Sequence, residues 1–290
     1  MAKTNLFFTG KGEIVMFEIE MTERSICETA STSSKGNQLK WEQDGWWYKA
    51  DCLGYEGLAE VAVSRILSYS NLDGVTEYEP GIIFYRGLPY RGCRSRNFLK
   101  ESERLVTLEH LHRSYYGIGL AGKLAEIQDV EERIAYTTDF VEKVTDLVDV
   151  GIYLTKMLEM DAFFLNEDRH TNNIAVIYDE GKNRYRLSPF FDMGLSLFSD
   201  VKEAYPISKN IVECRKIVEA KPFSRDFDEQ LDAANTLYGD FMRLHVSWKQ
   251  MERIVRMAGQ EADYPEEETE RVISVLRMQI RKYTYILEET

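Results

Sequence analysis

The sequence is poor in the features that mark secreted, zinc-binding and membrane-spanning proteins. Its 290 residues include four cysteines (Cys27, Cys52, Cys93, Cys214), and no two of them form a Cys-x-x-Cys pair. Scattered cysteines favour reduced, packed thiols over disulfides or a zinc site. No apolar run approaches the roughly 18 residues of a membrane span, and the amino terminus lacks the apolar core of a signal peptide. We therefore expect a cytoplasmic protein.

Positive charge is also scarce, since 36 Lys and Arg residues face 49 Asp and Glu residues and give a net charge of -13. This balance predicts no non-specific attraction to nucleic acid or to an anionic membrane, so neither is an expected partner. An anionic substrate would need locally placed cations. The hydrophobic fraction of 44% is high enough for a large core and excludes a disordered chain.

The hydrophobic pattern changes along the chain. The first ninety residues favour strands at 13–20, 38–42, 46–50 and 81–85, with a helix over 54–70. Beyond residue 100 the spacing is helical over 130–147, 150–160 and 225–287, interrupted by a hairpin at 174–178 and 184–187. The pattern predicts an α+β fold with a β-rich lobe over residues 1–90 and a mainly helical lobe over residues 91–290.

The densest polar cluster lies at 166–173, between an apolar helix and an apolar strand. Within it Asp168 and Asn173 have the Asp-x-x-x-x-Asn spacing of a kinase catalytic loop. Phosphoryl transfer needs a carboxylate to orient the attacking hydroxyl and a neutral oxygen to bind magnesium. Asp192, in the Asp-Met-Gly194 turn after the hairpin, stands where kinases place a second magnesium ligand.

Other kinase parts precede these residues in the expected order. A small-residue loop at 31–37 is followed by a strand lysine, Lys49, and then by a helix that carries Glu56 and Glu60. In a kinase the loop covers the nucleotide phosphates, and the strand lysine pairs with both the phosphates and a helix glutamate. Glu60 fits this role better than Glu56, because it stands further along the helix, but the sequence leaves both open.

Taken together, these segments resemble the bacterial HipA-like serine/threonine kinases. That family shares Asn-x-Asp-x-His-x-x-Asn, a short hairpin and then Ser/Ala-Pro-x-x-Asp, which here are Asn166–Asn173 and Ser188–Asp192. The stretch Ser33-Ser-Lys-Gly-Asn-Gln-Leu-Lys40 is similar to the family's phosphate loop. The resemblance covers roughly residues 30–200 and implies a two-lobed protein-kinase-like fold of the HipA and lipid-kinase kind.

The resemblance also implies roles for particular residues. Asp168 would be the catalytic carboxylate, Asn173 and Asp192 the magnesium ligands, and Lys49 the phosphate-pairing cation held by Glu60. His170, at the family's histidine position, would brace the catalytic loop. ATP and Mg²⁺ are therefore the expected cofactors.

The loop over the phosphates carries the remaining expected site residues, which are Ser34, Gly36 and Gln38 for nucleotide binding and Ser31, Ser33 and Ser34 for autophosphorylation. In the family, phosphorylation of this loop silences the kinase. A phosphate would add close to two negative charges where ATP must bind, so such inhibition has a physical basis.

The resemblance implies a cytosolic protein substrate, and a partner that is either an antitoxin or supplies the amino-terminal region found in longer family members. Two alternative functions remain open. The Asp-Arg-His-x-x-Asn segment also looks like the catalytic loop of phosphoinositide lipid kinases. A catalytically silent nucleotide-binding module that docks a partner is the third hypothesis.

Overall fold

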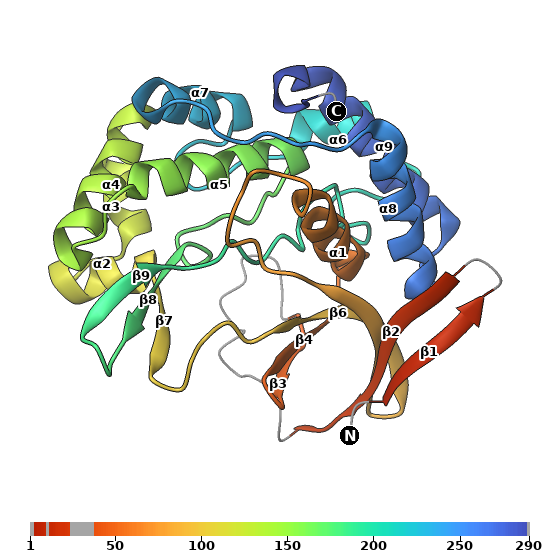
Figure 1. Cartoon of the computed structure of the whole chain (residues 1–290). Helices are drawn as coiled ribbons and strands as arrows, with labels where there is room; N and C mark the ends of the chain where they lie inside the picture. The colour runs from red at the N-terminus through yellow and green to blue at the C-terminus, as the bar shows by residue number, and fades with distance from the viewer. Residues whose placement is uncertain (1–2, 10–11, 24–37, 289–290) are drawn as a thin grey trace.

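The computed structural model describes residues 3–9, 12–23 and 38–288 (Figure 1). Two sheets lie on one side of a group of helices, and one helix, α1 (Glu56–Leu67), lies between the larger sheet and the remaining helices. Within the described ranges, no helix has the length and apolar character needed to cross a membrane.

The larger sheet forms the first lobe. Its described strands are β1 (Lys3–Thr9), β2 (Gly12–Met21), β3 (Lys40–Gln43), β4 (Trp46–Ala50), β5 (Glu79–Tyr85) and β6 (Leu88–Arg96), in the order β1-β2-β5-β6-β4-β3. Neighbours are antiparallel except β2 and β5, which are parallel. The strands expected around 13–20, 46–50 and 81–85 are confirmed. Because β6 continues to Arg96, this sheet extends beyond residue 90.

The turn between β3 and β4 follows from two residues. Asp44 and Gly45 both have positive φ, 54° and 75°. A tight hairpin needs this conformation, which glycine adopts freely and Asp tolerates. The turn pairs Lys40 with Lys49, so two lysines stand opposite each other on adjacent strands.

The second lobe is mainly helical. Its small sheet has the order β7-β8-β9, with β7 (Glu103–Thr107), β8 (Ala175–Asp179) and β9 (Arg184–Leu187). The helices are α2 (Leu108–Tyr116), α3 (Leu120–Glu126), α4 (Val130–Thr145), α5 (Val150–Phe164), α6 (Ile211–Ile217), α7 (Phe227–Tyr238), α8 (Trp248–Glu261) and α9 (Glu266–Lys282), followed by the 3-10 turn η3 (Thr284–Ile286). The structure confirms the helices expected over 130–147 and 150–160. It also confirms the hairpin expected at 174–178 and 184–187.

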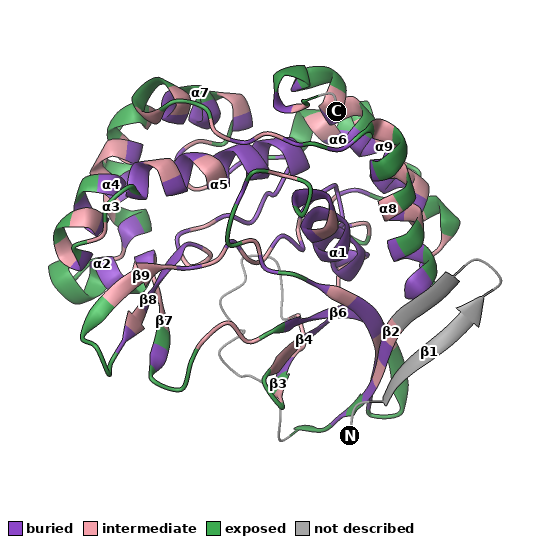
Figure 2. Ribbon diagram, in the orientation of Figure 1, coloured by how far each residue is buried: buried purple, intermediate pink, exposed green. Residues whose placement is uncertain are grey.

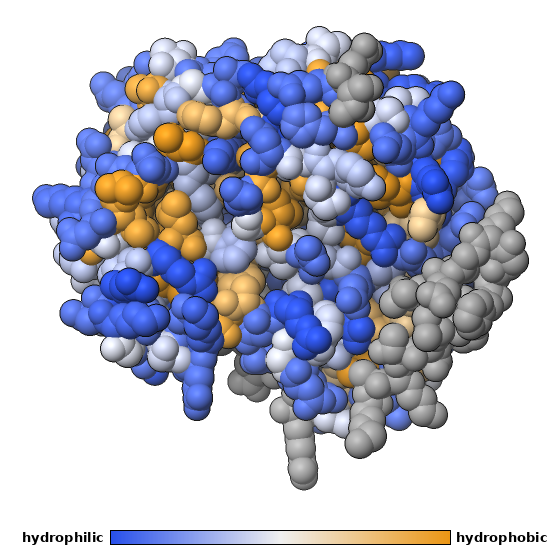
Figure 3. All heavy atoms as spheres, viewed as in Figure 1, coloured by the Kyte–Doolittle hydropathy of each residue, from blue (hydrophilic) through white to orange (hydrophobic). Residues whose placement is uncertain are grey.

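Burial explains why α5 and α1 are central. Almost every residue of both helices is buried, and Figure 2 shows them as the most continuously buried helices in that view. The buried side chains of α1 belong to the same core cluster as those of the helical lobe, whereas the larger sheet has a smaller core around Trp41, Tyr48 and Ile83. On the face drawn in Figure 3, hydrophilic side chains surround separate hydrophobic patches.

Two glycines allow α1 to approach the larger sheet closely. A Cβ on Gly57 of α1 would lie 2.7 Å from the backbone of Gly92 in β6, and a Cβ on Gly92 would lie 2.1 Å from the Lys49 carbonyl oxygen in β4. Real Cβ atoms do not approach backbone atoms this closely. Glycine at both positions therefore allows β4, β6 and α1 to pack closely around Lys49.

We predict that Gly92→Ala lowers the free energy of unfolding by about 2 kcal/mol or more, because the added methyl group must displace the β4 backbone. Urea unfolding followed by circular dichroism measures the change. Gly122→Ala is the matched control, since no atom lies within 4 Å of its Cβ position in α3 and alanine favours helix. Equal stability of the Gly92→Ala and Gly122→Ala proteins would contradict the close approach.

Candidate active site

A cavity of 470 Å³ lies at the junction of the two lobes. Its lining comes from widely separated parts of the chain, among them β3 and β4 with the residues that flank them, the segment around 97–99 that leaves β6, strand β7, the loop after α5, and the turn after β9. Lys49, Asp168, Asn173 and Asp192 all line it, together with Gln38 and Lys40. The structure thus brings together residues that the sequence places more than a hundred positions apart.

Lys49 connects the lobes electrostatically. Its Nζ lies 2.5 Å from Glu60 Oε1 in α1 and 2.7 Å from Asp192 Oδ1 in the second lobe. Burial disfavours the charged ammonium, but the Asp192 and Glu60 carboxylates outweigh it and raise the pKa of Lys49 well above its usual value. Lys49 is therefore a cation at physiological pH, although its side chain is almost fully buried.

Of the two helix glutamates, Glu60 is the one that contacts Lys49. Its second oxygen, Oε2, accepts a hydrogen bond of 2.9 Å from the Met193 backbone N–H, so Glu60 holds both the lysine and the turn of Asp192. Glu56 instead accepts hydrogen bonds from the backbone N–H groups of 52–54 at the start of α1. Such a carboxylate stabilises the positive end of the helix.

Asp192 has a backbone conformation with φ of 61°, and its N–H lies 3.3 Å from the Tyr78 hydroxyl. Its Oδ2 lies 3.4 Å from Lys40 Nζ, opposite the Lys49 contact. Burial alone would raise the pKa of Asp192, but the Lys40 and Lys49 ammonium groups hold it well below its usual range. The carboxylate is therefore ionised when it faces the cavity.

The loop after α5 positions Asp168. The Asn173 side-chain amide donates 2.8 Å to the Asp168 carbonyl oxygen, and the Asn172 N–H donates 3.2 Å to His170 Nδ1. Because Nδ1 accepts this bond, the neutral ring carries its proton on Nε2, which lies 3.6 Å from Asp168 Oδ2. Burial outweighs the Asp168 charge and lowers the pKa of His170. His170 thus faces Asp168 as a neutral ring.

Beneath this loop lies an ion pair that the sequence did not predict. Arg169 Nε and Nη2 contact the two oxygens of Asp161 in α5 at 2.9 and 3.0 Å, and both side chains are buried. Arg169 Nη1 also donates 3.0 Å to the Asn173 carbonyl and 2.8 Å to the Phe191 carbonyl. One guanidinium therefore ties the Asp168 loop to the Asp192 turn. Asp161, one of three charged residues in a mainly apolar helix, was the available signal.

The segment that joins the lobes lines the cavity through Asn97, Phe98 and Leu99. Arg186 in β9 donates to both oxygens of Glu103 and to the Phe98 carbonyl, which fixes this connection to the small sheet. The segment therefore lines the same cavity as Lys49.

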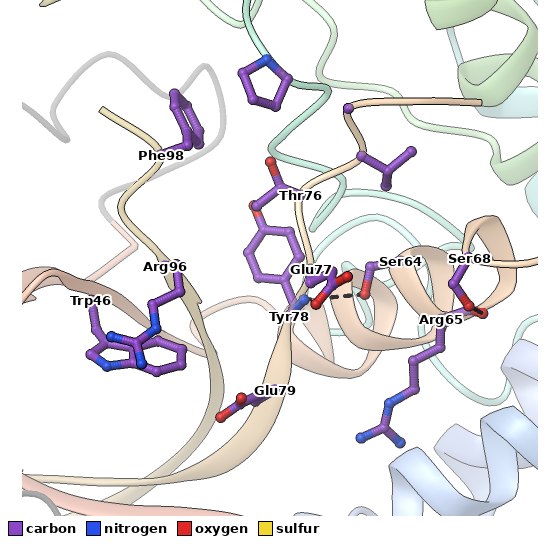
Figure 4. Close-up of a pocket in the computed structure, with 13 residues that line it drawn as sticks. Trp46, Ser64, Arg65, Ser68, Thr76, Glu77, Tyr78, Glu79, Arg96 and Phe98 are labelled. Carbon is purple, nitrogen blue, oxygen red and sulfur yellow. Dashed lines mark hydrogen bonds between the residues drawn. The ribbon is translucent and has the colours of Figure 1, made fainter. Parts of the chain in front are cut away.

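A second cavity of 560 Å³ is lined by Tyr78 together with residues of α1 such as Ser64 and Arg65 (Figure 4). Tyr78 and Phe98 line both cavities. The Tyr78 N–H donates to Ser64 Oγ of α1, the contact drawn as a dashed line, and the Tyr78 hydroxyl lies 3.4 Å from Lys49 Nζ. Tyr78, which was not anticipated, thus contacts both α1 and Lys49.

The residues expected on the phosphate loop have a mixed outcome. Gln38 lines the cavity, while Ser31, Ser33, Ser34 and Gly36 lie outside the described residues. Lys40 stands at the end of that motif and contacts Asp192, although no role was assigned to it. The opposing Lys40–Lys49 pair of the hairpin explains how both reach one carboxylate.

Asn173 and Asp192 fit a magnesium ion. An amide oxygen and an ionised carboxylate that line one cavity are hard oxygen donors, and Mg²⁺ in kinases is held by such a pair together with substrate phosphates. Across the described residues, no cluster of three or more His, Cys, Asp or Glu side chains could hold a metal alone.

We predict that Arg169→Met lowers the free energy of unfolding by about 3–5 kcal/mol, because it leaves the Asp161 carboxylate buried and uncompensated. The double variant Asp161→Leu/Arg169→Met should lose less than the single variant. Urea unfolding of each protein measures this. Arg104→Met is the matched control, since Arg104 pairs with Glu180 on the surface. If Arg169→Met were as stable as Arg104→Met, the result would contradict a stabilising role for the buried pair of Arg169 and Asp161.

Comparison with known proteins supports the fold. No protein-family model matches the chain, and no curated protein matches it by sequence. The structure is similar to that of the proinflammatory kinase CtkA of Helicobacter pylori, with a TM-score of 0.58 and 15% identity over 93% of this chain and 96% of that chain. A hydra Fam20 structure with sugar aligns at a TM-score of 0.38 and 11% identity, over 87% and 84% of the two chains. The predicted α+β class with a β-rich first lobe and a helical second lobe is confirmed, and the chain has a kinase-like fold.

Proposed function

We propose that this chain is an ATP- and Mg²⁺-dependent kinase of HipA-like type that phosphorylates serine or threonine in a cytosolic protein. One observation carries the proposal: Lys49, Asp168, Asn173 and Asp192 line a single cavity, and Lys49 is paired with Glu60. This is the set of groups that kinases use to bind and transfer a phosphoryl group. The fold shared with a Helicobacter pylori kinase is consistent with it.

Each residue has a role that its position allows. Lys49 would contact the nucleotide phosphates and Glu60 would hold it, while the adenine ring would lie by Asn97–Leu99. Asn173 and Asp192 would hold Mg²⁺, which neutralises charge on the phosphate oxygens when bound. Asp168 would orient the acceptor hydroxyl and take its proton. His170, neutral and 3.6 Å from Asp168, would keep that carboxylate in place.

Two lysines at the cavity explain how a protein of negative net charge could bind an anionic nucleotide. Lys40 and Lys49 both contact Asp192 at the cavity wall. When a nucleotide and a metal ion bind, these two ammonium groups can leave the Asp192 carboxylate and contact phosphate oxygens instead. The local charge then favours nucleotide even though the whole chain is negative.

The finer parts of the proposal concern regulation. We propose autophosphorylation at Ser31, Ser33 or Ser34, on the loop that precedes Gln38, with loss of nucleotide binding as its consequence. We also propose a protein partner of antitoxin type or one that supplies an amino-terminal region. The cytoplasm is the compartment consistent with reduced cysteines.

We predict that incubation with Mg-ATP adds phosphate to the parent protein and that Asp168→Asn lowers the rate at least about 100-fold while leaving the fold intact. Intact-mass spectrometry measures the added phosphate, and peptide mapping locates it. Asp146→Asn is the matched control: Asp146 is an exposed residue of φ 56° after α4, a conformation that asparagine accepts, so it should match the parent.

The other outcomes separate the alternatives. Transfer to phosphoinositide vesicles with no transfer to protein would favour a lipid kinase. ATP binding without transfer to any acceptor would favour a silent nucleotide-binding module. No ATP binding would contradict all three.

A further inference from the structure

Lys221 lies beside Asp168, from a part of the chain with no role in the proposed site so far. Its Nζ is 3.4 Å from Asp168 Oδ1, while His170 and Asn173 approach the other oxygen, Oδ2, at 3.6 and 3.5 Å. The two oxygens of the carboxylate therefore have different neighbours: an ammonium group on one side, and a neutral ring and an amide on the other.

The loop that carries Lys221, between α6 and α7, is anchored on both sides of it. The Ala220 N–H donates 2.8 Å to the Arg225 carbonyl, and the Phe223 carbonyl accepts 2.6 Å from Arg133 Nη1 in α4. Ala220 and Phe223 are both buried in the core of the helical lobe. The backbone is thus held in place, and the Lys221 side chain, 35% exposed, extends from it to Asp168.

Lys221 approaches Asp168 from outside the nucleotide cavity. Asp168 lines that cavity, whereas Lys221 is not part of its lining. An acceptor hydroxyl has to reach the terminal phosphate at Asp168 from outside, because the nucleotide fills the cavity. Lys221 therefore stands on the acceptor side, and Lys49 stands on the nucleotide side.

The positive charge of Lys221 lies where it can affect the transfer step. In the transfer step the acceptor oxygen forms a bond to the terminal phosphorus, the bond from that phosphorus to the bridging oxygen of ADP breaks, and the hydroxyl proton moves to Asp168. Negative charge moves with the phosphoryl group from the side of Lys49 toward the acceptor. A fixed cation at the acceptor side favours that movement.

Resting on the proposed kinase function, we propose that Lys221 is a positioning residue for transfer: it holds the Asp168 carboxylate through Oδ1 from the acceptor side, and it places positive charge where the phosphoryl group arrives. Lys221 acts on the transfer step and does not contribute to nucleotide binding. This distinguishes it from Lys49, which lines the nucleotide cavity.

The test compares Lys221→Met and Lys221→Arg with the parent, measuring kcat and KM for Mg-ATP from phosphate incorporation and Kd for Mg-ATP by calorimetry. Lys221→Met should lower kcat about 10- to 100-fold with Kd and KM for Mg-ATP changed less than about twofold. Lys221→Arg, which keeps the charge and the reach, should recover most of kcat. Lys249→Met, at an exposed position of α8, controls for loss of a surface lysine.

The outcomes separate the two proposals. A parent that incorporates no phosphate contradicts the proposed function and the role of Lys221 with it. An active parent whose Lys221→Met variant keeps the parental kcat contradicts the role of Lys221 alone. The role of Lys221 is also contradicted if the Kd of Lys221→Met for Mg-ATP rises in step with its loss of kcat. It is contradicted as well if Lys221→Arg is as slow as Lys221→Met.

Discussion

The arrangement of the site depends on one buried guanidinium. Arg169 is withdrawn from water beneath the cavity, which costs several kcal/mol of hydration free energy unless its donors are satisfied. The two-point contact with Asp161 and the bonds to the Asn173 and Phe191 carbonyls offset that cost. Since those carbonyls belong to the loop of Asp168 and to the turn before Asp192, the same bonds set the distance between that loop and that turn.

A second constraint acts between the lobes. Lys49 is on a strand of the first lobe, Glu60 is on a helix whose core belongs to the second, and Asp192 follows the small sheet. The lysine contacts both carboxylates, so the position of β4 is coupled to α1 and to the Asp192 turn. Gly57 and Gly92 permit this by letting α1 and β6 approach closely. Packing and electrostatics therefore position the same lysine.

Much of this could be predicted from the sequence, for identifiable reasons. Periodicity located α1, α4 and α5, because this signal is local. The spacing of Asp168, Asn173 and Asp192 singled out residues that line one cavity. Local pattern did not separate the short helices α2 and α3 or strand β7, whose place depends on contacts with β8 and α4 rather than on a long periodic run.

The residues that were missed act through long-range contacts. Asp161 pairs with a residue eight positions away, Tyr78 contacts Lys49 and Asp192, and Lys221 reaches Asp168 across 53 positions. No spacing rule connects such positions, since the fold alone brings them together. Lys40 was within the quoted phosphate-loop motif, but its contact with Asp192 follows from the register of the hairpin.

The measurement that tests the central claim most directly is calorimetric titration of the purified chain with ATP, with and without Mg²⁺, beside Asp192→Asn. If the cavity binds a magnesium–nucleotide complex, ATP binding to the parent will strengthen on addition of Mg²⁺, and Asp192→Asn will lose that dependence. Absence of ATP binding, or binding that is equally strong without Mg²⁺ and in the variant, would contradict the assignment of this cavity as a kinase active site.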